Sequence, residues 1–262
     1  MAGVAVVTGG SSGIGKAACG LFLKGGYTVY ELSRKGKSEN GIKHITADVT
    51  DEKSVKAAFE EIYKAEKHID VLVNNAGMGI SGAIEFTELS AAKKIFDVNF
   101  FGTLICTKAA LAYLRQSDDA HIVNLSSVAA PVAIPFQAFY SATKAAINSL
   151  TLALRNEVKP FGIRVSAVMP GDAKTGFTDA REKSETGNEL YSEAISRAVE
   201  AMEKDERGGM PPEAVARVVY KAATKKNPKP LYTAGGVYKL FVVLTKLLPT
   251  RTFNWIVGKI YN

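Results

Sequence analysis

Short apolar runs and longer amphipathic stretches alternate along the first 170 residues of the chain. Runs bounded by turn residues predict strands, and apolar positions at helical spacing predict helices. The predicted strands are Val4–Thr8, Thr28–Leu32, Ile42–Ala47, Asp70–Asn74, His121–Leu125 and Arg164–Met169. The predicted helices lie near Gly15–Lys24, at Lys53–Ala65, over about Ala91–Arg115 and from Tyr140 to about Val158. Strands separated by helices imply a parallel sheet covered on both faces, so the predicted fold class is α/β with a doubly wound sheet.

The pattern changes after Pro170. Residues 171–190 are polar and contain glycine, which predicts a mobile loop over a site. Helices are expected at Tyr191–Lys204 and Pro212–Thr224. No linker marks a second domain, so we expect one domain over residues 1–262, with an amphipathic C-terminal extension at 233–262.

The extension has apolar residues at helical spacing with lysines between them, and Pro249 divides it from a second apolar stretch. The first set is Leu240, Val243, Leu244, Leu247 and Leu248, and the second stretch runs from Phe253 to Tyr261. Neither is long enough to span a bilayer. Three interpretations stay open: the extension packs on the body or on a second subunit, it covers a lipid-like substrate, or it lies on a membrane surface.

Composition narrows the class of protein. Of the 262 residues 47% are hydrophobic, enough for a sizeable core, and the formal net charge is +7. A basic excess suits anionic lipid, nucleic acid or a phosphorylated ligand, but more often it is solvated surface. The basic residues are not concentrated in one motif, which argues against nucleic-acid binding. The N-terminus lacks a signal peptide's charged region and cleavage site.

The cysteines and histidines form no metal motif. Cys19 and Cys106 lie in apolar helical patterns without partners at metal-ligand spacing, so we expect both in the core and the protein in a reducing, cytoplasmic compartment. His44, His68 and His121 are scattered and are expected at the surface or at strand ends. We therefore predict no metal site.

A glycine-rich turn, TGGSSGIG, lies between the first strand and the first helix. Glycines let the backbone turn tightly and approach a pyrophosphate, and the helix N-terminus presents free N–H groups to that anion. This placement predicts a dinucleotide site. The predicted binding residues of the turn are Gly9, Ser11, Ser12, Gly13, Ile14 and Gly15.

The end of the second strand indicates which dinucleotide binds. An acid about 20 residues past the motif would bind the ribose 2′-hydroxyl and repel a 2′-phosphate. Ser33 takes that position and Arg34 and Lys35 follow it, which favours NADP(H), with Ser11 as a further donor. Solvation of the two cations without a ligand is the alternative. Glu31 is the one contrary acid, and strand alternation is expected to point it away from Ser33 if the strand stays regular.

Two tyrosine–lysine pairs, Tyr63 with Lys67 and Tyr140 with Lys144, have the spacing that puts both side chains on one helical face. Tyr140 follows the fifth strand, 13 residues after Ser127, and small side chains surround it that would let a flat cofactor pack close. Tyr63 lies in a charged amphipathic helix with no turn motif before it. We therefore expect chemistry from the second pair and surface decoration from the first.

Taken in order, these motifs resemble the short-chain dehydrogenase/reductase family, in its compact single-domain branch. The matches cover most of the chain but not the last 30 residues. They are TGGSSGIG at 8–15, Asp48 after the third strand, NNAG at 74–77, Asn99 in FDVNFFG, Ser127, Tyr140 with Lys144, and Pro170-Gly171 with Thr175. The resemblance implies a Rossmann-type sheet of about seven strands with helices on both faces.

The resemblance also implies catalytic roles. Tyr140 would be the general acid in carbonyl reduction and the base in alcohol oxidation, and the cation of Lys144 would lower its pKa. Lys144 would also bond the nicotinamide ribose, and Ser127 would hold the substrate oxygen. Asn99 would keep a water near Lys144 for proton relay, and a helix-bend asparagine bonded to backbone is its alternative role.

Further cofactor contacts rest on the resemblance alone. Asp48 and Val49 would contact adenine. The residues that would line the cofactor or lie against nicotinamide are Asn75, Ala76, Gly77, Pro170, Gly171 and Thr175. In the segment PGDAKT, Ala173 replaces a more usual branched residue, and Asp172 is less usual beside the cofactor.

We predict an NADP(H)-dependent oxidoreductase that acts on an apolar ketone or its secondary alcohol. A cytoplasmic homo-oligomer is expected, with peripheral membrane contact through the extension left open. A 3-oxoacyl-thioester reductase is the runner-up. The rival of another class is a non-catalytic NADP(H)-sensing protein, and the complete set of Asn99, Ser127, Tyr140 and Lys144 argues against it.

Overall fold

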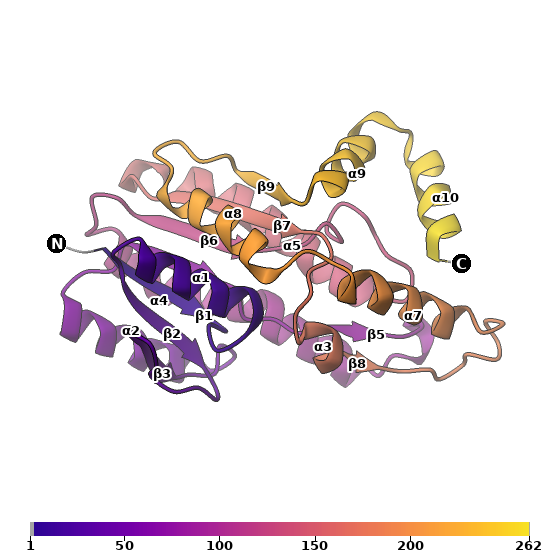
Figure 1. Ribbon diagram of the computed structural model, residues 1–262, viewed down its shortest axis with the longest axis horizontal. Coiled ribbons are helices and arrows are strands. Elements are labelled where there is room, and N and C mark those ends of the chain that lie inside the picture. The colour runs from indigo at the N-terminus through magenta and orange to yellow at the C-terminus, as the bar shows by residue number, and fades with distance from the viewer. Residues whose placement is uncertain (1–2, 262) are drawn as a thin grey trace.

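The computed structural model describes residues 3–261, and a seven-stranded parallel sheet lies at its centre (Figure 1). The strand order is β3-β2-β1-β4-β6-β7-β9. The strands are β1 (Val4–Thr8), β2 (Thr28–Ser33), β3 (Ile42–Thr46), β4 (Val71–Asn74), β6 (His121–Leu125), β7 (Arg164–Pro170) and β9 (Leu231–Ala234). The prediction of a doubly wound sheet is confirmed. The order reverses between β1 and β4, where such sheets form a ligand-binding crevice.

Helices cover both faces of the sheet. On one face lie α1 (Gly13–Lys24) and α8 (Pro212–Thr224), and on the other lie α2 (Glu52–Glu66), α4 (Gly102–Leu114) and α5 (Ala138–Glu157). Alternation along β1 divides its side chains between two cores: Val4 and Val6 pack with α2 and α4, while Ala5 and Val7 pack with α1 and α8. Cys19 and Cys106 are fully buried in these cores, as expected.

The seventh strand was not located from the sequence. β9 pairs with the outer side of β7, with Ala167 opposite Leu231. Its four residues, LYTA, are too few to produce a clear pattern, so the predicted extension wrongly included residues 233 and 234, which belong to the sheet. The last residue of that extension, 262, and residues 1 and 2 lie outside the described part of the chain.

Residues 171–190 are more regular than the predicted mobile loop. They contain α6 (Phe177–Ala180) and β8 (Glu182–Lys183), and β8 pairs with β5 (Ile80–Ser81) in a second, two-stranded sheet. The helix expected from Tyr191 is α7 (Ala194–Arg207). Two short 3₁₀ turns lie at Ile84–Phe86 and Lys159–Phe161.

The helical region expected over about Ala91–Arg115 is not uniform. It consists of α3 (Leu89–Phe96), a π-helical turn (Asp97–Phe101) and α4. By length and composition alone the stretch Leu89–Leu114 is long and apolar enough to cross a membrane. The core accounts for part of this apolar character, because α4 packs against α2, β4 and β6, while Leu89 and Phe101 stay exposed.

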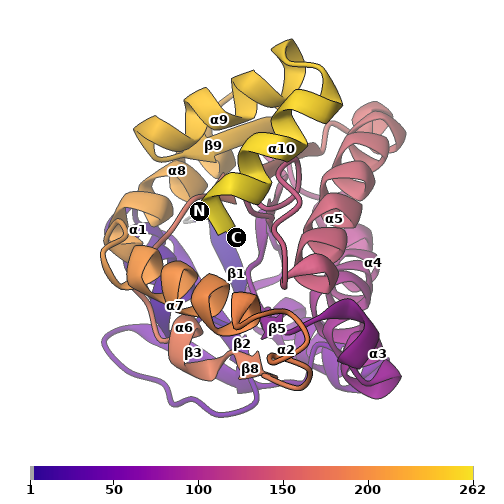
Figure 2. The ribbon, with the colours of Figure 1, turned by 90° about the vertical axis from the view of Figure 1, so that its right-hand side faces the viewer.

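The C-terminal extension forms two helices, α9 (Gly236–Leu247) and α10 (Thr250–Tyr261), on either side of Pro249 (Figures 1 and 2). Its inner side packs on the body. Phe253 and Val257 of α10 are buried against Val132, which precedes α5. Of the three interpretations of the extension, packing on the body is therefore confirmed.

Candidate functional site

A cavity of about 1170 Å³ lies at the carboxyl ends of the strands. It is lined by residues that follow β1, β2, β4, β6 and β7, the side on which α/β sheets bind ligands. Its volume is slightly above the usual range for small-molecule pockets, which suits a dinucleotide with a substrate beside it. We call the part near β1 and β2 the nucleotide end and the part near Tyr140 and Phe177 the substrate end.

The glycine-rich turn has the geometry that a bound pyrophosphate needs. Gly9 and Gly13 have φ values of 65° and 51°, which favour glycine. A Cβ on Gly15 would lie 2.3 Å from the Gly9 carbonyl oxygen, so Gly15 allows α1 to pack against the turn rather than lining the cavity itself. The N-terminus of α1 follows directly, and its free N–H groups attract an anion. The turn therefore fits a dinucleotide.

Side-chain hydrogen bonds join this turn to the segment after β4. The Asn75 amide donates to the carbonyl oxygens of Thr8 and Gly9, both at 3.0 Å. The backbone N–H groups of Asn75 and Ala76 both donate to Thr8 Oγ1 at 3.0 Å. Thr8 is thus a positioning residue that the sequence reasoning did not single out, although it begins the motif.

The cations predicted to select the cofactor lie at the nucleotide end. Ser33, Arg34 and Lys35 line the cavity, and both cations are exposed. Asp48 also lines it, and hydrogen bonds from the Thr50 backbone N–H and hydroxyl hold the Asp48 pKa below its usual value. Arg34 contributes to this lowering of the pKa as a nearby positive charge.

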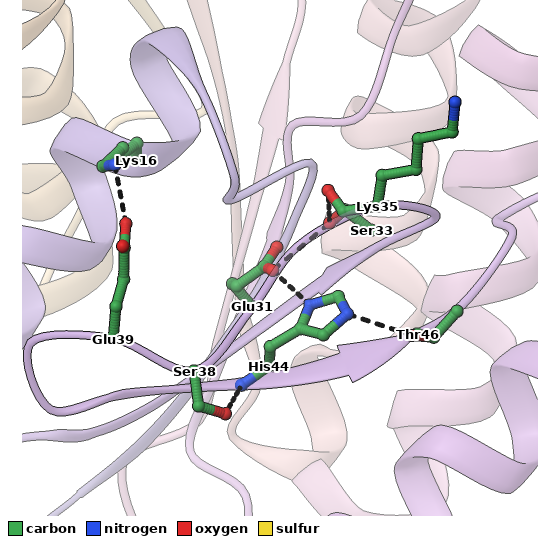
Figure 3. A network of polar contacts seen from close by, with 8 residues as sticks. All are labelled: Lys16, Glu31, Ser33, Lys35, Ser38, Glu39, His44 and Thr46. Carbon is green, nitrogen blue, oxygen red and sulfur yellow. Dashed lines mark hydrogen bonds and ion pairs between the residues drawn. The ribbon is translucent and has the colours of Figure 1, made fainter.

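The expectation for Glu31 is wrong. Residues two apart on a strand share a face, so Glu31 lies with Ser33, whose hydroxyl donates to Glu31 Oε1 at 3.2 Å (Figure 3). Glu31 is buried, and its Oε1 also contacts His44 Nδ1. His44 Nε2 in turn lies 3.0 Å from Thr46 Oγ1. The Glu31 carboxylate is therefore bonded to Ser33 and His44 and does not line the cavity.

Two histidines expected at the surface or at strand ends are more enclosed than that. The His44 side chain is mostly buried in the middle of β3. His121 begins β6, so its strand-end position is confirmed, but it is buried, and burial lowers its pKa. Within residues 3–261, no three His, Cys, Asp or Glu side chains are grouped so as to hold a metal ion.

Asn99 sits in the π-helical turn, an irregularity that is frequent at functional sites. Its side chain is fully buried and bonds both backbone groups of Met78: Oδ1 accepts from the N–H at 2.8 Å, and Nδ2 donates to the carbonyl at 3.0 Å. A Cβ on Gly77 would lie 3.2 Å from Asn99 Oδ1 and 3.8 Å from Lys144 Nζ. The side chain thus has the backbone-bonding role held as its alternative, and the water-holding role stays a prediction.

Ser127, Tyr140 and Lys144 meet in the same cavity. Ser127 follows β6 and hydrogen-bonds with the Tyr140 hydroxyl, while Tyr140 and Lys144 share one face of α5. The Lys144 ammonium donates to the Leu125 carbonyl at 2.8 Å and lies 5.6 Å from the centroid of the Tyr140 ring. A strand end and one helix turn therefore bring the predicted catalytic groups together.

The protein groups around Tyr140 do not give the lowered pKa that was expected for it. Burial raises the pKa of Tyr140 to about 12, and the hydrogen bond with Ser127 offsets this only in part. Burial also lowers the pKa of Lys144 to about 8. Desolvation dominates both values because it penalises the charged form of each group.

Segments distant in the sequence complete the substrate end. The Phe177 ring of α6 lies 5.7 Å from the Tyr140 ring, centroid to centroid. Asp172 and Glu206 also line the cavity. The Tyr238 hydroxyl of α9 donates to Asp172 Oδ2, so the extension reaches the rim of the site. Phe177 and Glu206 were missed from the sequence because no motif marks them.

The structure brings most of the predicted residues together. Those that line the cavity are Gly9, Ser11, Ser12, Gly13, Ile14, Ser33, Arg34, Lys35, Asp48, Val49, Asn75, Ala76, Gly77, Ser127, Tyr140, Lys144, Pro170, Gly171 and Thr175. Gly15 and Asn99 lie behind its wall. The other tyrosine–lysine pair, Tyr63 and Lys67, lies outside the cavity. Tyr63 donates to Gln116 Oε1 at 2.8 Å, and Lys67 is exposed beyond the end of α2. The prediction that this pair belongs to the surface is confirmed.

Known proteins share this sequence and architecture. The family model described as short chain dehydrogenase matches residues 3–186. A 3-ketodihydrosphingosine reductase of Bacteroides thetaiotaomicron is 39% identical, over 96% of this chain and 95% of that protein. An NADPH-dependent 3-dehydrocapnine reductase of Ornithobacterium rhinotracheale is 33% identical, over 97% and 96%. The solved structure of ElxO with NADP bound is 29% identical and superposes with a TM-score of 0.76 over 92% of this chain and all of that one.

The motif order, the seven-stranded sheet and these relatives agree on the family. The chain belongs to the short chain dehydrogenase family of oxidoreductases, which use a nicotinamide cofactor.

Proposed function

We propose that the protein is an NADPH-dependent reductase that converts a ketone to a secondary alcohol, and that the ketone is carried on an apolar chain beside an amino group. One observation carries the proposal. Ser127, Tyr140 and Lys144 converge at one end of a cavity whose other end holds two exposed cations, Arg34 and Lys35.

NADPH would supply the hydride. The hydroxyls of Ser127 and Tyr140 would hold the carbonyl oxygen, where negative charge develops during reduction. Because the Tyr140 pKa is raised to about 12, the phenol keeps its proton at neutral pH and can give it to the strongly basic alkoxide. The positive charge of Lys144 stabilises the phenolate that remains. Asn99 fixes the backbone of Met78, which follows Gly77 at the Lys144 ammonium.

The preference for NADPH is supported by the end of β2. Arg34 and Lys35 can meet a 2′-phosphate, and Ser33 is too small to exclude it. The contrary acid, Glu31, is buried and paired with His44, so it does not oppose the phosphate from the cavity surface. One relative is named NADPH-dependent, and one similar structure holds NADP.

The substrate class is supported by the relatives and by charge. Two relatives are named as reductases of 3-ketodihydrosphingosine and of 3-dehydrocapnine. Dihydrosphingosine is a long-chain amino alcohol, so its 3-keto form has an ammonium group next to the ketone. The carboxyl groups of Asp172 and Glu206 line the cavity close enough to raise the Tyr140 pKa through their charges. Glu206 is already paired with Arg181, so Asp172 is the carboxylate that suits such a cation.

The test is NADPH oxidation with three substrates: 3-ketodihydrosphingosine, an alkyl ketone of equal length without the amine, and a 3-oxoacyl thioester. We expect kcat/KM to be highest for the amino ketone, by about tenfold over the simple ketone. Tyr140→Phe should lower kcat roughly 10²- to 10⁴-fold while NADPH binding stays near wild type, since one proton donor is lost.

Tyr63→Phe is the matched control and should behave as wild type. Preference for the thioester would favour the runner-up reductase. NADPH binding without turnover of any substrate would favour the sensing protein.

A further inference from the structure

The C-terminal helices α9 and α10 have two apolar sides, and the body covers only one of them. The inner side packs through Phe253 and Val257, and Tyr238 contacts Gly171 and Asp172 at the rim of the site. Both helices lie at the edge of the molecule (Figure 2), and other apolar residues of the two helices are exposed there. A helix pair that is apolar on both sides needs a second partner, because large exposed apolar patches are uncommon on monomeric soluble proteins.

The outer side is defined by five exposed apolar residues. On α9 they are Val237, Leu240, Val243 and Leu247, which recur every three or four residues and are 48–72% exposed. The regular spacing places these residues on one helix face. On α10 it is Trp255, which is 63% exposed and lies two residues from each of the buried Phe253 and Val257, so it is on the opposite side of that helix. We call these five residues the outer apolar face.

Every charge on this hairpin is positive. The extension at 233–262 contains no Asp or Glu, and its four cations are Lys239, Lys246, Arg251 and Lys259. All four are exposed, and none forms an ion pair with another described residue. Apolar side chains among unpaired cations, with a tryptophan among them, are the composition that binds the interface of an anionic bilayer.

We propose that the outer apolar face of α9 and α10 docks on an anionic lipid surface. A second copy of the chain is the less suitable occupant. In a two-fold contact the same patch meets itself, so four unpaired cations would face four others without a carboxylate on either hairpin. A bilayer of anionic lipid instead offers apolar depth for the leucines and negative head groups for the cations.

The test is co-sedimentation with vesicles of phosphatidylcholine alone and of phosphatidylcholine mixed equally with phosphatidylglycerol. We expect the full chain to bind the anionic vesicles at least about tenfold more strongly than the neutral ones, and added salt to weaken the binding. The double variant Leu240→Glu with Leu247→Glu should lose about tenfold or more of that binding. Circular dichroism and NADPH binding show whether each variant is folded.

The matched control is Ile84→Glu with Leu190→Glu, because these residues are 63% and 78% exposed but lie outside the hairpin. The control should bind vesicles as wild type does. The proposal would be overturned if the wild-type protein did not bind anionic vesicles, or if both double variants lost vesicle binding equally. So would a dimer that the hairpin variant alone dissociates, because the face would then be a subunit contact. None of these measurements depends on which ketone is reduced.

Discussion

The nucleotide end and the substrate end of the cavity are built in different ways. At the nucleotide end, short loops between consecutive elements supply the groups, as with Gly9, Gly13 and Arg34 just after β1 and β2. At the substrate end, the contacts join segments far apart in the chain. Tyr238 reaches Asp172 across 66 residues, and Phe253 packs against Val132.

This difference explains where a motif is informative. A tight turn beside an anion needs glycine and a helix N-terminus, so the chemistry restricts which residues can stand there. A wall of a substrate cavity needs only suitable shape and polarity, which many residues can supply. Phe177 and Glu206 therefore stand in the cavity without any local signal, while TGGSSGIG is readable in the sequence.

The largest effect is expected from Arg34→Asp, which tests the cofactor specificity assigned to the nucleotide end. The change removes a charge-assisted hydrogen bond to the 2′-phosphate and adds repulsion, so the ratio of kcat/KM for NADPH over NADH should fall about 10- to 100-fold. Steady-state kinetics with both cofactors measures it. Lys37→Asp is the control with the same charge change, since the Lys37 side chain is 81% exposed and outside the cavity. An unchanged ratio in Arg34→Asp would remove the assignment of this loop as the phosphate site.

The pH dependence of reduction probes Lys144, where the two ends meet. Burial lowers the pKa of Lys144 to about 8, so its charge is present below that pH and is lost as the pH rises through it. We expect kcat/KM for ketone reduction to be level below pH 7.5 and to fall about tenfold by pH 9. Tyr140, with a pKa of about 12, should add no second fall in that range.

The arginine in Lys144→Arg keeps its charge at all these pH values. The kcat/KM of this variant should therefore not fall between pH 7.5 and 9, whatever its residual rate. A wild-type profile that is level to pH 10 would show that the charge on Lys144 is not needed.

The smallest expected effect concerns the contact between the extension and the site. Tyr238→Phe removes the hydroxyl bonded to Asp172 and should lower the free energy of unfolding by about 1 kcal/mol in urea denaturation. Asn75→Ala is the comparison variant at the nucleotide end. Asn75→Ala should lower the free energy of unfolding by more, about 2 kcal/mol, because it removes both hydrogen bonds from the side-chain amide to Thr8 and Gly9. If Tyr238→Phe lowered the free energy of unfolding more than Asn75→Ala does, the contact of α9 with Asp172 would stabilise the fold more than the hydrogen bonds of the glycine-rich turn do.

The sequence by itself determined the α/β class, six of the seven strands, the dinucleotide turn and the group of Ser127, Tyr140 and Lys144. Each of these depends on periodicity or on local geometry, which a chain carries in consecutive residues.

Only the tertiary structure decided the rest. It placed β9 beside β7, turned Glu31 into a pair with His44, and raised the pKa of Tyr140 through burial. It also covered one apolar side of the C-terminal helices and left the other exposed. These outcomes depend on which distant segments meet and how much water they exclude, and no local pattern contains that information.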